Sequence, residues 1–237
     1  MARKSKRRPT SRPVRAAAAR PAGSNRDKAI AALLELLREQ SFESIGMGRI
    51  AEGAGLSLAE LRAEFGSVLS ILAAHIKDVD RAVLAAQDAD MADESPRERL
   101  FDVLMRRLDI LEPHKEAVRS LLRSASCNPG LALALNGLAV QSQQWMLTAA
   151  GIGASGPKGM LRAQGLAMLF ANVLRTWIDD DDEGHARTLA ALDREMARGQ
   201  RLAGLLDEVC RIPERARDLV RRSRGPRRRG RHAREAA

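Results

Sequence analysis

Residues 50–65 read IAEGAGLSLAELRAEF, which predicts two short helices joined by a tight turn. Gly55 can adopt the positive φ that ends a helix, and the apolar Leu56 follows it. Ser57 can cap the next helix, and Glu60 three residues later completes a capping box. This spacing is typical of a helix-turn-helix, so nucleic acid is the first partner that the sequence suggests.

The second of these helices has an inner and an outer face. Its apolar side chains recur at helical spacing and are expected to be buried: Leu58, Leu61 and Phe65. The candidate DNA-binding residues lie on the other face and at the caps: Ser57, Ala59, Glu60, Arg62, Ala63 and Ser67. Arg62 is the only cation among them that could donate into a groove. Carboxylates beside a phosphate backbone are unfavourable unless one of them accepts from a cytosine amino group.

The run continues as Gly66, Ser67 and a long apolar helix, close to the N-terminus of a helical chain. Over residues 24–87 it resembles the TetR family of transcriptional regulators. The resemblance implies that the short second helix of the motif enters the major groove and that a long fourth helix links it to a ligand-binding helical body. It also implies that the last two helices pair two subunits. Beyond residue 87 the resemblance rests on the number and order of helices alone.

Three positions depart from the pattern of that family. The family usually has an aromatic residue where this chain has Arg62, often another at Glu64, and a phosphate-contacting lysine at Val68. Each change removes a habitual contact with the DNA backbone. Two interpretations therefore stay open. The motif either binds DNA, or it has kept its packed core and lost the ability to recognise a DNA sequence.

The excess positive charge of +10 is confined to the ends of the chain. Residues 1–22 hold eight Lys or Arg and no acid, residues 221–237 hold eight Arg and one acid, and the remainder has a formal charge of −5. Such blocks of like charge, together with Pro, Ser, Ala and Gly, predict disordered segments. They could act as electrostatic arms that neutralise phosphates, serve only as solubilising ends, or contact an anionic membrane surface.

Composition indicates an all-α protein, because hydrophobic residues make up 45% of the 237 residues with little β-branched alternation and only nine Pro. Cys127 and Cys210 are far apart and form no CxxC pair, which is typical of a reducing compartment. No apolar stretch approaches the length of about 18 residues that indicates a membrane span, and the N-terminus lacks the apolar region of a secretory signal. We therefore expect a cytoplasmic, nucleoid-associated protein, although in a eukaryote the Arg-rich N-terminus would pass for a mitochondrial presequence.

Helix signals divide the chain into four parts: a basic arm over 1–23, a DNA-binding head with its connecting helix over 24–87, a ligand-binding and dimerisation body over 95–210, and a basic tail over 211–237. The clearest helix start is at Ser95, where Pro96 takes the first helical position and Glu98 completes a capping box. The body is expected to contain five helices, at about 96–111, 113–124, 131–149, 158–178 and 185–208.

The last two of these helices are the candidates for pairing two subunits into a homodimer. Their apolar stripes look too wide for one neighbour, and the residues expected in the interface are Leu166, Leu169, Val173, Trp177, Leu192 and Met196. The alternative is that both stripes pack inside one subunit.

A pocket for a small apolar ligand is expected in the body. Its candidate lining residues are Met105, Leu135, Leu138, Trp145 and Phe170. Apolar residues at helical spacing more often indicate ordinary core than a pocket.

The segment that begins at Trp177 carries a second resemblance. Its acidic turn, followed by Thr188, Leu192, Asp193 and Arg194, is similar to the end of the lipid-binding accessory proteins of ubiquinone biosynthesis. Those proteins share the TetR fold, have an eroded helix-turn-helix and do not regulate transcription. This resemblance implies a body that holds an isoprenoid or another lipid, and basic ends that face a membrane.

No arrangement of residues indicates catalysis. The four histidines, His75, His114, His185 and His232, are scattered, and no metal-binding, nucleophile or phosphate-loop motif occurs. The acidic run 179–183 lacks the alternating spacing of a calcium loop. We therefore expect a protein that is not an enzyme and needs no cofactor or metal. The favoured function is a dimeric regulator that binds double-stranded DNA and responds to a small apolar ligand, and the alternative is a lipid-binding accessory protein.

Overall fold

The computed structural model describes residues 23–86, 91, 93–182 and 184–201, and over these ranges the chain is helical with no strand. The all-α fold predicted from composition is confirmed. The predicted basic arm, apart from Gly23, and the predicted basic tail lie outside the described residues. In the part of the chain that is described, no helix is both long and apolar enough to cross a bilayer.

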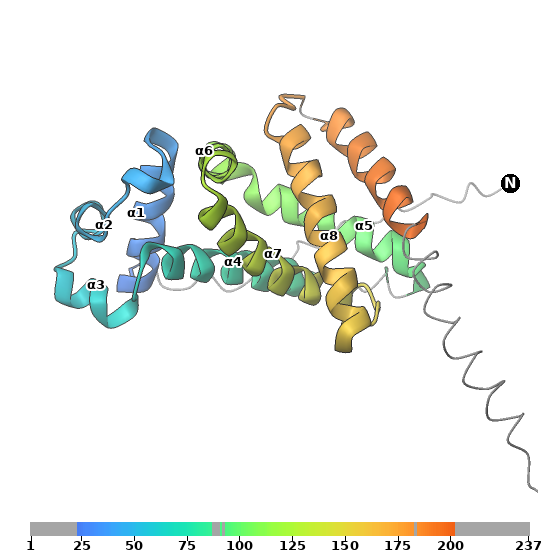
Figure 1. Ribbon diagram of the computed structural model, residues 1–237, viewed down its shortest axis with the longest axis horizontal. Helices are drawn as coiled ribbons and strands as arrows, with labels where there is room; N and C mark the ends of the chain where they lie inside the picture. Colours follow the sequence, from blue (N-terminus) through green and yellow to red (C-terminus); the bar gives the residue numbers. More distant parts are fainter. Residues whose placement is uncertain (1–22, 87–90, 92, 183, 202–237) are drawn as a thin grey trace, which may run out of the picture.

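Four helical segments form the N-terminal head: α1 (Asn25–Glu39), the 3-10 turn η1 (Phe42–Ser44), α2 (Met47–Ala54) and α3 (Leu58–Glu64). Helix α1 begins as predicted, because the Ser24 hydroxyl accepts a hydrogen bond from the Asp27 backbone N–H at 3.1 Å. The inner stripe of α1 packs against α2 and α3, and the head occupies one end of the molecule (Figure 1). The most deeply buried side chains of this core include Leu33, Leu37, Ile50 and Leu61.

Helix α4 (Val68–Ala85) connects the head to the body. Its first turn is capped by Ser67 and Ser70, each of which accepts a hydrogen bond from the backbone N–H of the other, at 3.1 and 3.0 Å. Its N-terminal half contributes Ile71 to the apolar core of the head, whereas its C-terminal half contributes Val83 to the apolar core of the body. One continuous helix is therefore built into both halves of the molecule.

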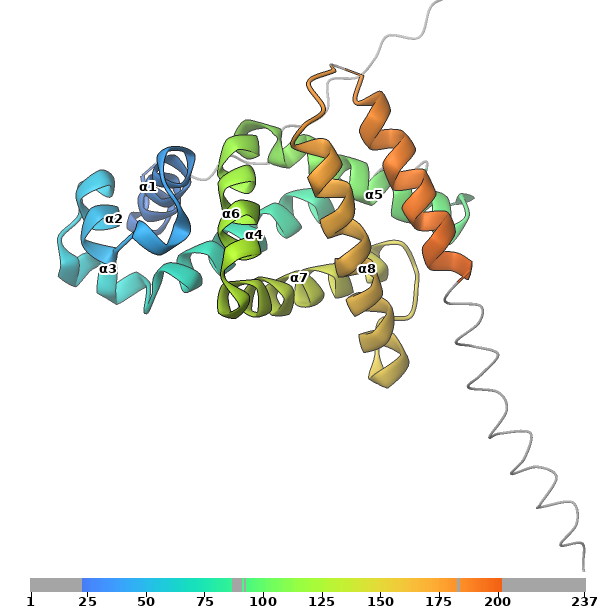
Figure 2. The same cartoon turned by 45° about the horizontal axis from the view of Figure 1, so that its top comes forward.

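The body contains α5 (Pro96–Leu111), the 3-10 turn η3 (Glu112–His114), α6 (Lys115–Cys127), α7 (Pro129–Ala149), α8 (Gly156–Trp177) and a further helix over residues 186–201. Helices α4 and α7 run side by side, α8 crosses α7, and the further helix lies against α8 (Figures 1 and 2). The helix predicted over 185–208 is observed up to residue 201, which is the last described residue.

Local signals explain where the body helices begin. Ser95 Oγ accepts a hydrogen bond from the Glu98 N–H at 3.3 Å, and the Glu98 carboxylate accepts one from the Ser95 N–H at 3.0 Å, so the predicted capping box is confirmed. Helix α7 begins at Pro129, two residues before its predicted start, because the Asn128 side chain caps its first turn. Helix α6 begins two residues later than predicted because η3 precedes it.

Asp180 stabilises the turn between α8 and the helix over residues 186–201. Its carboxylate accepts hydrogen bonds from the Thr188 N–H and hydroxyl at 2.8 and 2.6 Å, and its backbone carbonyl accepts one from Lys115 Nζ at 2.7 Å. The Lys115 ammonium also lies 5.4 Å from the centre of the buried Trp177 ring. Trp177 and Thr188, which carry part of the resemblance to lipid-binding accessory proteins, therefore have a structural role here: they join α8 to the helix that follows.

The six residues predicted for the dimer interface are all buried within one chain: Leu166, Leu169, Val173, Trp177, Leu192 and Met196. Helix α8 packs on α7 and also on residues 186–201, so its wide apolar stripe has two neighbours in the same subunit. A Cβ on Gly199 would lie only 3.4 Å from Leu169 Cδ1, which reflects how closely the two helices approach. Within one chain these side chains therefore already belong to the apolar core of the body, and their place in a dimer interface stays a prediction.

The five residues predicted to line one ligand pocket are not brought together. Trp145 is exposed to solvent, Phe170 is buried in the core of the body, and Leu135 packs against the core of the head. Met105 lies partly buried beside the body core, and Leu138 is half-buried on α7. The reason is that α7 packs against α4, α5, α6 and α8, so different positions along it meet different neighbours.

Candidate nucleic-acid interface

A glycine in the left-handed backbone conformation joins α2 to α3. Gly55 has φ 63° and ψ 36°, a conformation that residues with a Cβ rarely adopt. The Leu56 N–H donates a hydrogen bond to the Ala51 carbonyl at 2.9 Å and so closes the end of α2. The chain then turns directly into α3, and the predicted helix-turn-helix is present (Figure 1).

Ser57 and Glu60 form the predicted capping box of α3. Ser57 Oγ accepts a hydrogen bond from the Glu60 N–H at 3.2 Å, while Glu60 Oε2 accepts from the Ser57 N–H at 2.8 Å and from the Ser57 hydroxyl at 2.7 Å. The hydroxyl and then the backbone N–H of Ser57 hold the pKa of the Glu60 carboxyl below its ordinary value. These two side chains, like Ser67 at the start of α4, make capping hydrogen bonds at helix termini.

Leu58 lies on the surface, contrary to prediction. It is 62% exposed, whereas Leu61 and Phe65 of the same stripe are buried. Helix α3 has only seven residues and buries its second turn against α1 and α2, so no described neighbour covers the side chain at its first position. Leu58 therefore joins the candidate contact residues. The sequence held a signal for this, because the capping box places Leu58 in the first turn of a very short helix.

The outer face of α3 is small and has few hydrogen-bond donors. Ala59, Arg62, Ala63 and Glu64 are all exposed on it. Arg62 makes no hydrogen bond or ion pair with another described residue, and its Nη1 lies 3.5 Å from the point where a Cβ on Gly66 would stand. The two alanines allow a close approach to a partner, and Arg62 is the only cation on α3 that can donate to a base.

The head has no excess of positive charge. Residues 23–86 contain seven Lys or Arg and nine Asp or Glu, a formal charge of −2. Val68, where the resemblance implies a lysine, is half-buried against the apolar core of the head. Lys28 in the first turns of α1 is close enough to Glu60 to help lower the pKa of its carboxyl. The first turns of α1, which follow the basic residues 1–22 in the sequence, therefore lie near α3.

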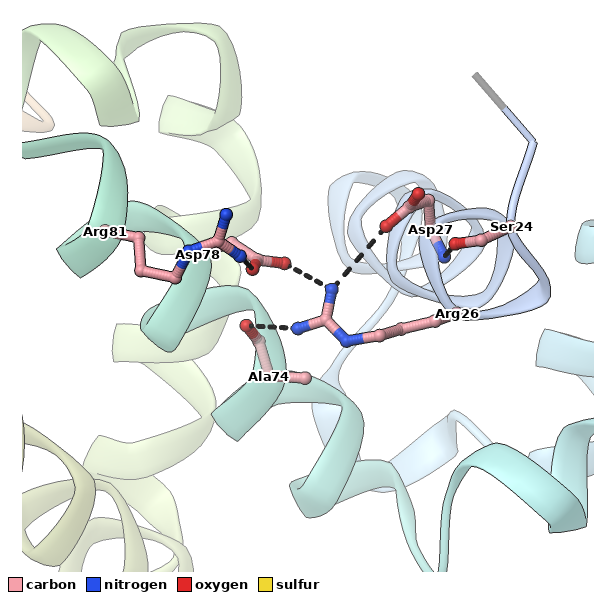
Figure 3. A network of polar contacts seen from close by, with 6 residues as sticks. All are labelled: Ser24, Arg26, Asp27, Ala74, Asp78 and Arg81. Atoms are coloured by element: carbon pink, nitrogen blue, oxygen red, sulfur yellow. Dashed lines mark hydrogen bonds and ion pairs between the residues drawn. The ribbon is translucent and has the colours of Figure 1, made fainter. Parts of the chain in front are cut away.

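Arg26 fixes α1 to α4 (Figure 3). Its guanidinium donates to Asp78 Oδ2 at 2.6 Å and to the Ala74 carbonyl at 3.2 Å, and it lies 3.5 Å from Asp27 Oδ1. Arg81 donates to the other oxygen of Asp78 at 3.2 Å. Polar contacts as well as apolar packing therefore set the orientation of the head on α4.

Helix α6 also packs against the head and makes hydrogen bonds to it. Ser124 Oγ accepts a hydrogen bond from the Phe42 N–H at 3.0 Å, and Ser120 Oγ donates one to the Gln40 carbonyl at 2.9 Å. Ala117 of the same helix is buried in the apolar core of the head. An open hollow of about 710 Å³, lined mainly by polar side chains of α1, η1 and α6, lies at this junction. A displacement of α6 would therefore displace the head.

A buried ion pair joins the second half of α4 to the body. Arg107 Nη1 on α5 donates to Asp80 Oδ1 at 2.5 Å, and Ser142 Oγ on α7 donates to the same oxygen at 2.6 Å. The Arg107 and Asp80 side chains are only 7% and 11% exposed. The guanidinium carbon also lies 5.6 Å from the centre of the Phe170 ring. One carboxylate on α4 thus connects that helix to α5 and α7.

His75 of α4 and His114 of η3 meet edge to face, with ring centres 5.2 Å apart. Burial is the main reason that the pKa of His75 falls to about 4; His114 and Arg107 lower it further, and Asp78 acts in the opposite direction. Burial also lowers the pKa of His114. Both rings are therefore neutral near pH 7. No group of three or more His, Cys, Asp or Glu among the described residues is arranged to hold a metal ion.

Several solved structures share this arrangement of helices. A TetR transcriptional regulator from Nitrosomonas europaea superposes with a TM-score of 0.57 at 22% identity, over 74% of this chain and 97% of its own. A TetR regulator from a Rhodococcus species superposes with a TM-score of 0.51 at 21% identity, over 72% of this chain and 94% of its own. A TetR-family regulator from Streptomyces coelicolor superposes with a TM-score of 0.51 at 16% identity, over 78% of this chain and 83% of its own. No family model matches the sequence, and no curated protein matches it. At these identities the similarity shows the fold, so the TetR-like fold predicted from the resemblance is confirmed.

Proposed function

We propose that this protein is a DNA-binding transcriptional regulator. The observation that carries the proposal is the helix-turn-helix. Gly55, in the left-handed conformation, ends α2 and allows the chain to turn into α3, and no described residue covers the outer face of α3. The fold supports the same function, because the solved structures that share it include transcriptional regulators.

In this proposal α3 enters the major groove with its outer face. Arg62 donates to the O6 and N7 acceptors of a guanine, and Leu58 makes an apolar contact with a thymine methyl group. Ala59 and Ala63 let the helix approach the base edges closely. Glu64 either accepts from a cytosine amino group or opposes binding on its side of the helix.

The charge that attracts DNA comes from the ends of the chain. Because the head has a formal charge of −2, the eight basic residues of 1–22 and the eight of 221–237 supply the electrostatic part of the affinity by releasing counterions from phosphates. Residues 1–22 precede α1 in the sequence, and Lys28 in the first turns of α1 lies close enough to Glu60 of α3 to affect its pKa. Such an arm would bind any duplex, and α3 would add the preference for a sequence.

Regulation follows from the position of α4. A homodimer presents two α3 helices to successive major grooves, about 34 Å apart. A small apolar ligand in the body would favour one of two orientations of α4 and so change that separation. Arg26 transmits the shift to the head, and Arg107 anchors α4 to the body. Such a regulator would act in the cytoplasm, on the nucleoid.

Selection of bound sequences from a pool of random duplexes tests the proposal. The full-length protein is used at about 200 mM salt, where purely electrostatic binding is weak. We expect enrichment of a palindrome whose two half-sites are about 10 base pairs apart, centre to centre. A pool that stays random after repeated rounds would contradict the proposal.

A lipid-binding protein that does not read DNA is the second candidate. The negative formal charge of the head and the half-buried Val68 favour it, because both reduce contact with phosphates. The body would then hold an isoprenoid or another lipid, and the basic ends would face an anionic membrane. Mass spectrometry of an organic extract of the purified protein tests this candidate. A stoichiometric prenyl lipid, together with a pool that stays random, would favour it over the regulator.

A further inference from the structure

An open hollow of about 710 Å³ lies on the surface of the body, where α7 ends and α8 begins (Figure 2). None of the described residues that line it is charged, although 30% of the chain is charged. The functional groups that it presents are one indole ring, one thioether and four neutral hydrogen-bonding groups, on Trp145, Met160, Gln141, Gln144, Thr148 and Ser155. A hollow of this volume is within the range of about 300–1,000 Å³ that is typical of small-molecule sites.

The loop that forms one wall of the hollow is fixed where it leaves α7. Helix α7 ends in a Schellman motif, in which Gly151 has φ 72° and the Ile152 N–H donates to the Leu147 carbonyl at 2.8 Å. Arg99 Nε donates a hydrogen bond to the Ala150 carbonyl at 3.1 Å. The start of the loop therefore has a defined conformation before any ligand binds.

The loop is also fixed where it enters α8. Arg162 Nη1 donates a hydrogen bond to the Gly153 carbonyl at 3.2 Å. A Cβ on Gly159 would lie only 2.1 Å from the carbonyl carbon of Ala154, so the loop packs directly on the backbone of α8. The Ala154 side chain packs against the apolar core of the body. The wall is thus formed in advance, and a ligand would not have to order it.

The polar groups of the hollow can both donate and accept hydrogen bonds. Gln141 and Ser155 make no side-chain hydrogen bond to another described residue, and Gln144 Nε2 contacts Met160 Sδ at 3.7 Å. A carboxylate or a phosphate only accepts hydrogen bonds and an ammonium group only donates them, whereas a hydroxyl group does both. Because no described lining residue offers a counter-charge, the hollow favours an uncharged ligand with several hydroxyl groups.

Trp145 adds a flat apolar surface to this lining. It is 56% exposed, whereas the other tryptophan of the chain, Trp177, is fully buried. The C–H groups on one face of a pyranose ring can cover such an indole ring, while the hydroxyl groups at the edge of the sugar stay free for hydrogen bonds. A wholly apolar ligand would leave the amide side chains without partners. A sugar therefore complements both parts of the lining.

We propose that this hollow binds a neutral sugar, with one face of its ring on Trp145 and its hydroxyl groups bound by Gln141, Gln144 and Ser155. The inference goes beyond the proposed function, because sugar binding does not depend on DNA binding and is measured without DNA.

Intrinsic fluorescence of the full-length chain tests the site, because Trp145 is the exposed one of its two tryptophans. The probes are cellobiose and the methyl glycosides of glucose, galactose, mannose and N-acetylglucosamine. At least one of them should change the emission saturably and protect Trp145 from quenching by iodide, with a dissociation constant of about 1 mM or below. No saturable change with any of these sugars would overturn the proposal. A response to adenosine alone would also overturn it, because the hollow would then hold a flat base and not a sugar ring.

Substitution of Trp145 locates the bound sugar. Saturation-transfer NMR observes the ligand and so does not need the tryptophan signal. Trp145→Ala should weaken binding at least about 10-fold, and Trp145→Phe should retain much of it because a ring remains. Leu133→Ala is the matched control: Leu133 is also exposed on α7 but lies about three turns from Trp145 and does not line the hollow. Equal affinities of Trp145→Ala and the wild type would place the sugar elsewhere and overturn the site.

Two further variants separate hydrogen bonding from shape. Gln141→Ala removes a hydrogen-bonding group and should weaken binding about 2- to 10-fold. Gly159→Ala forces the backbone of Ala154 to move, so it should reduce binding although Trp145 and both amides remain. Circular dichroism confirms that each variant is folded. Undiminished binding by both variants would contradict a sugar held against this wall.

Discussion

Asp78 and Asp80 stand two positions apart on α4, and each is bound by an arginine from a different half of the molecule. Asp78 accepts a hydrogen bond from Arg26 of the head at 2.6 Å, and Asp80 accepts one from Arg107 of the body at 2.5 Å. Two positions on a helix are about 200° apart around its axis, so the two carboxylates face opposite sides. Helix α4 is thus anchored to both halves, and a ligand that tilts it has to strain or break one of these contacts.

Replacing Arg107 with Met should destabilise the protein strongly. Asp80 would then be buried without its counter-charge, and breaking a buried pair in this way costs about 3–5 kcal/mol. Adding Asp80→Asn should recover much of the loss, because an Asn side chain can still accept the hydrogen bond from Ser142. Urea denaturation measures the free energy of unfolding of both variants. Equal values for the single and the double variant would contradict a buried, ionised pair.

Acid should destabilise the protein through His75. In the unfolded chain its imidazole has the ordinary pKa of 6.5, but in the folded chain the pKa is about 4. Between these values the unfolded state binds more protons, so stability falls as the pH is lowered from 6.5 towards 4. The loss at pH 4.5 should be about 2–3 kcal/mol relative to pH 7.

The variant His75→Gln isolates this effect, because it removes the titrating ring while His114 and the carboxylates remain. Urea denaturation of both proteins at pH 7 and at pH 4.5 gives the comparison. The wild type should lose more stability than the variant over this interval. Parallel losses would mean that folding does not lower the pKa of His75.

Local signals in the sequence predicted the head well. The serine caps at Ser24 and Ser57 and the glycine at Gly55 act within a few residues, so their effect on the chain does not depend on the rest of the fold. The helix that carries the candidate site, α3, was accordingly predicted with its capping box. Even there, Leu58 was misplaced, because periodicity indicates that a side chain faces inward and does not say where the neighbouring helices end.

Contacts between distant segments could not be predicted in this way. Leu169 and Val173 lie on a broad apolar stripe in the sequence, and only the structure reveals that residues 186–201 of the same chain cover part of it. The pairing of Asp80 with Arg107 joins residues 27 positions apart on different helices. No spacing rule connects such positions, because the packing of three helices brings them together.

The basic arm should control the salt dependence of DNA binding. Replacing the eight Lys and Arg of residues 1–22 with Gln in the full-length chain removes all the positive side-chain charge from the segment that precedes α1. In a plot of log affinity against log salt, the slope should become less steep by about 0.9 for each phosphate contact that is lost. Fluorescence anisotropy with a random duplex measures it. An unchanged slope would exclude the arm from phosphate contact.

Arg62 should carry much of the sequence preference of the head. Removing its side chain in Arg62→Ala loses a bidentate contact with guanine, which is worth about 1–3 kcal/mol, or about 5- to 150-fold in affinity for the selected site. Affinity for a random duplex should change little, because that binding depends on the arms. Leu58→Ala should reduce the preference for thymine at one position and weaken binding less.

Arg38→Ala is the matched control for Arg62→Ala. Arg38 is also exposed on the head, but it lies in the last turn of α1, at the opposite end of that helix from Lys28 and α3. Its loss removes one positive charge without touching the reading surface, so it should leave the ratio of specific to random affinity unchanged. Anisotropy titrations of both variants against both duplexes give that ratio. Equal effects of the two substitutions would mean that Arg62 contributes only charge, and that α3 does not read bases through it.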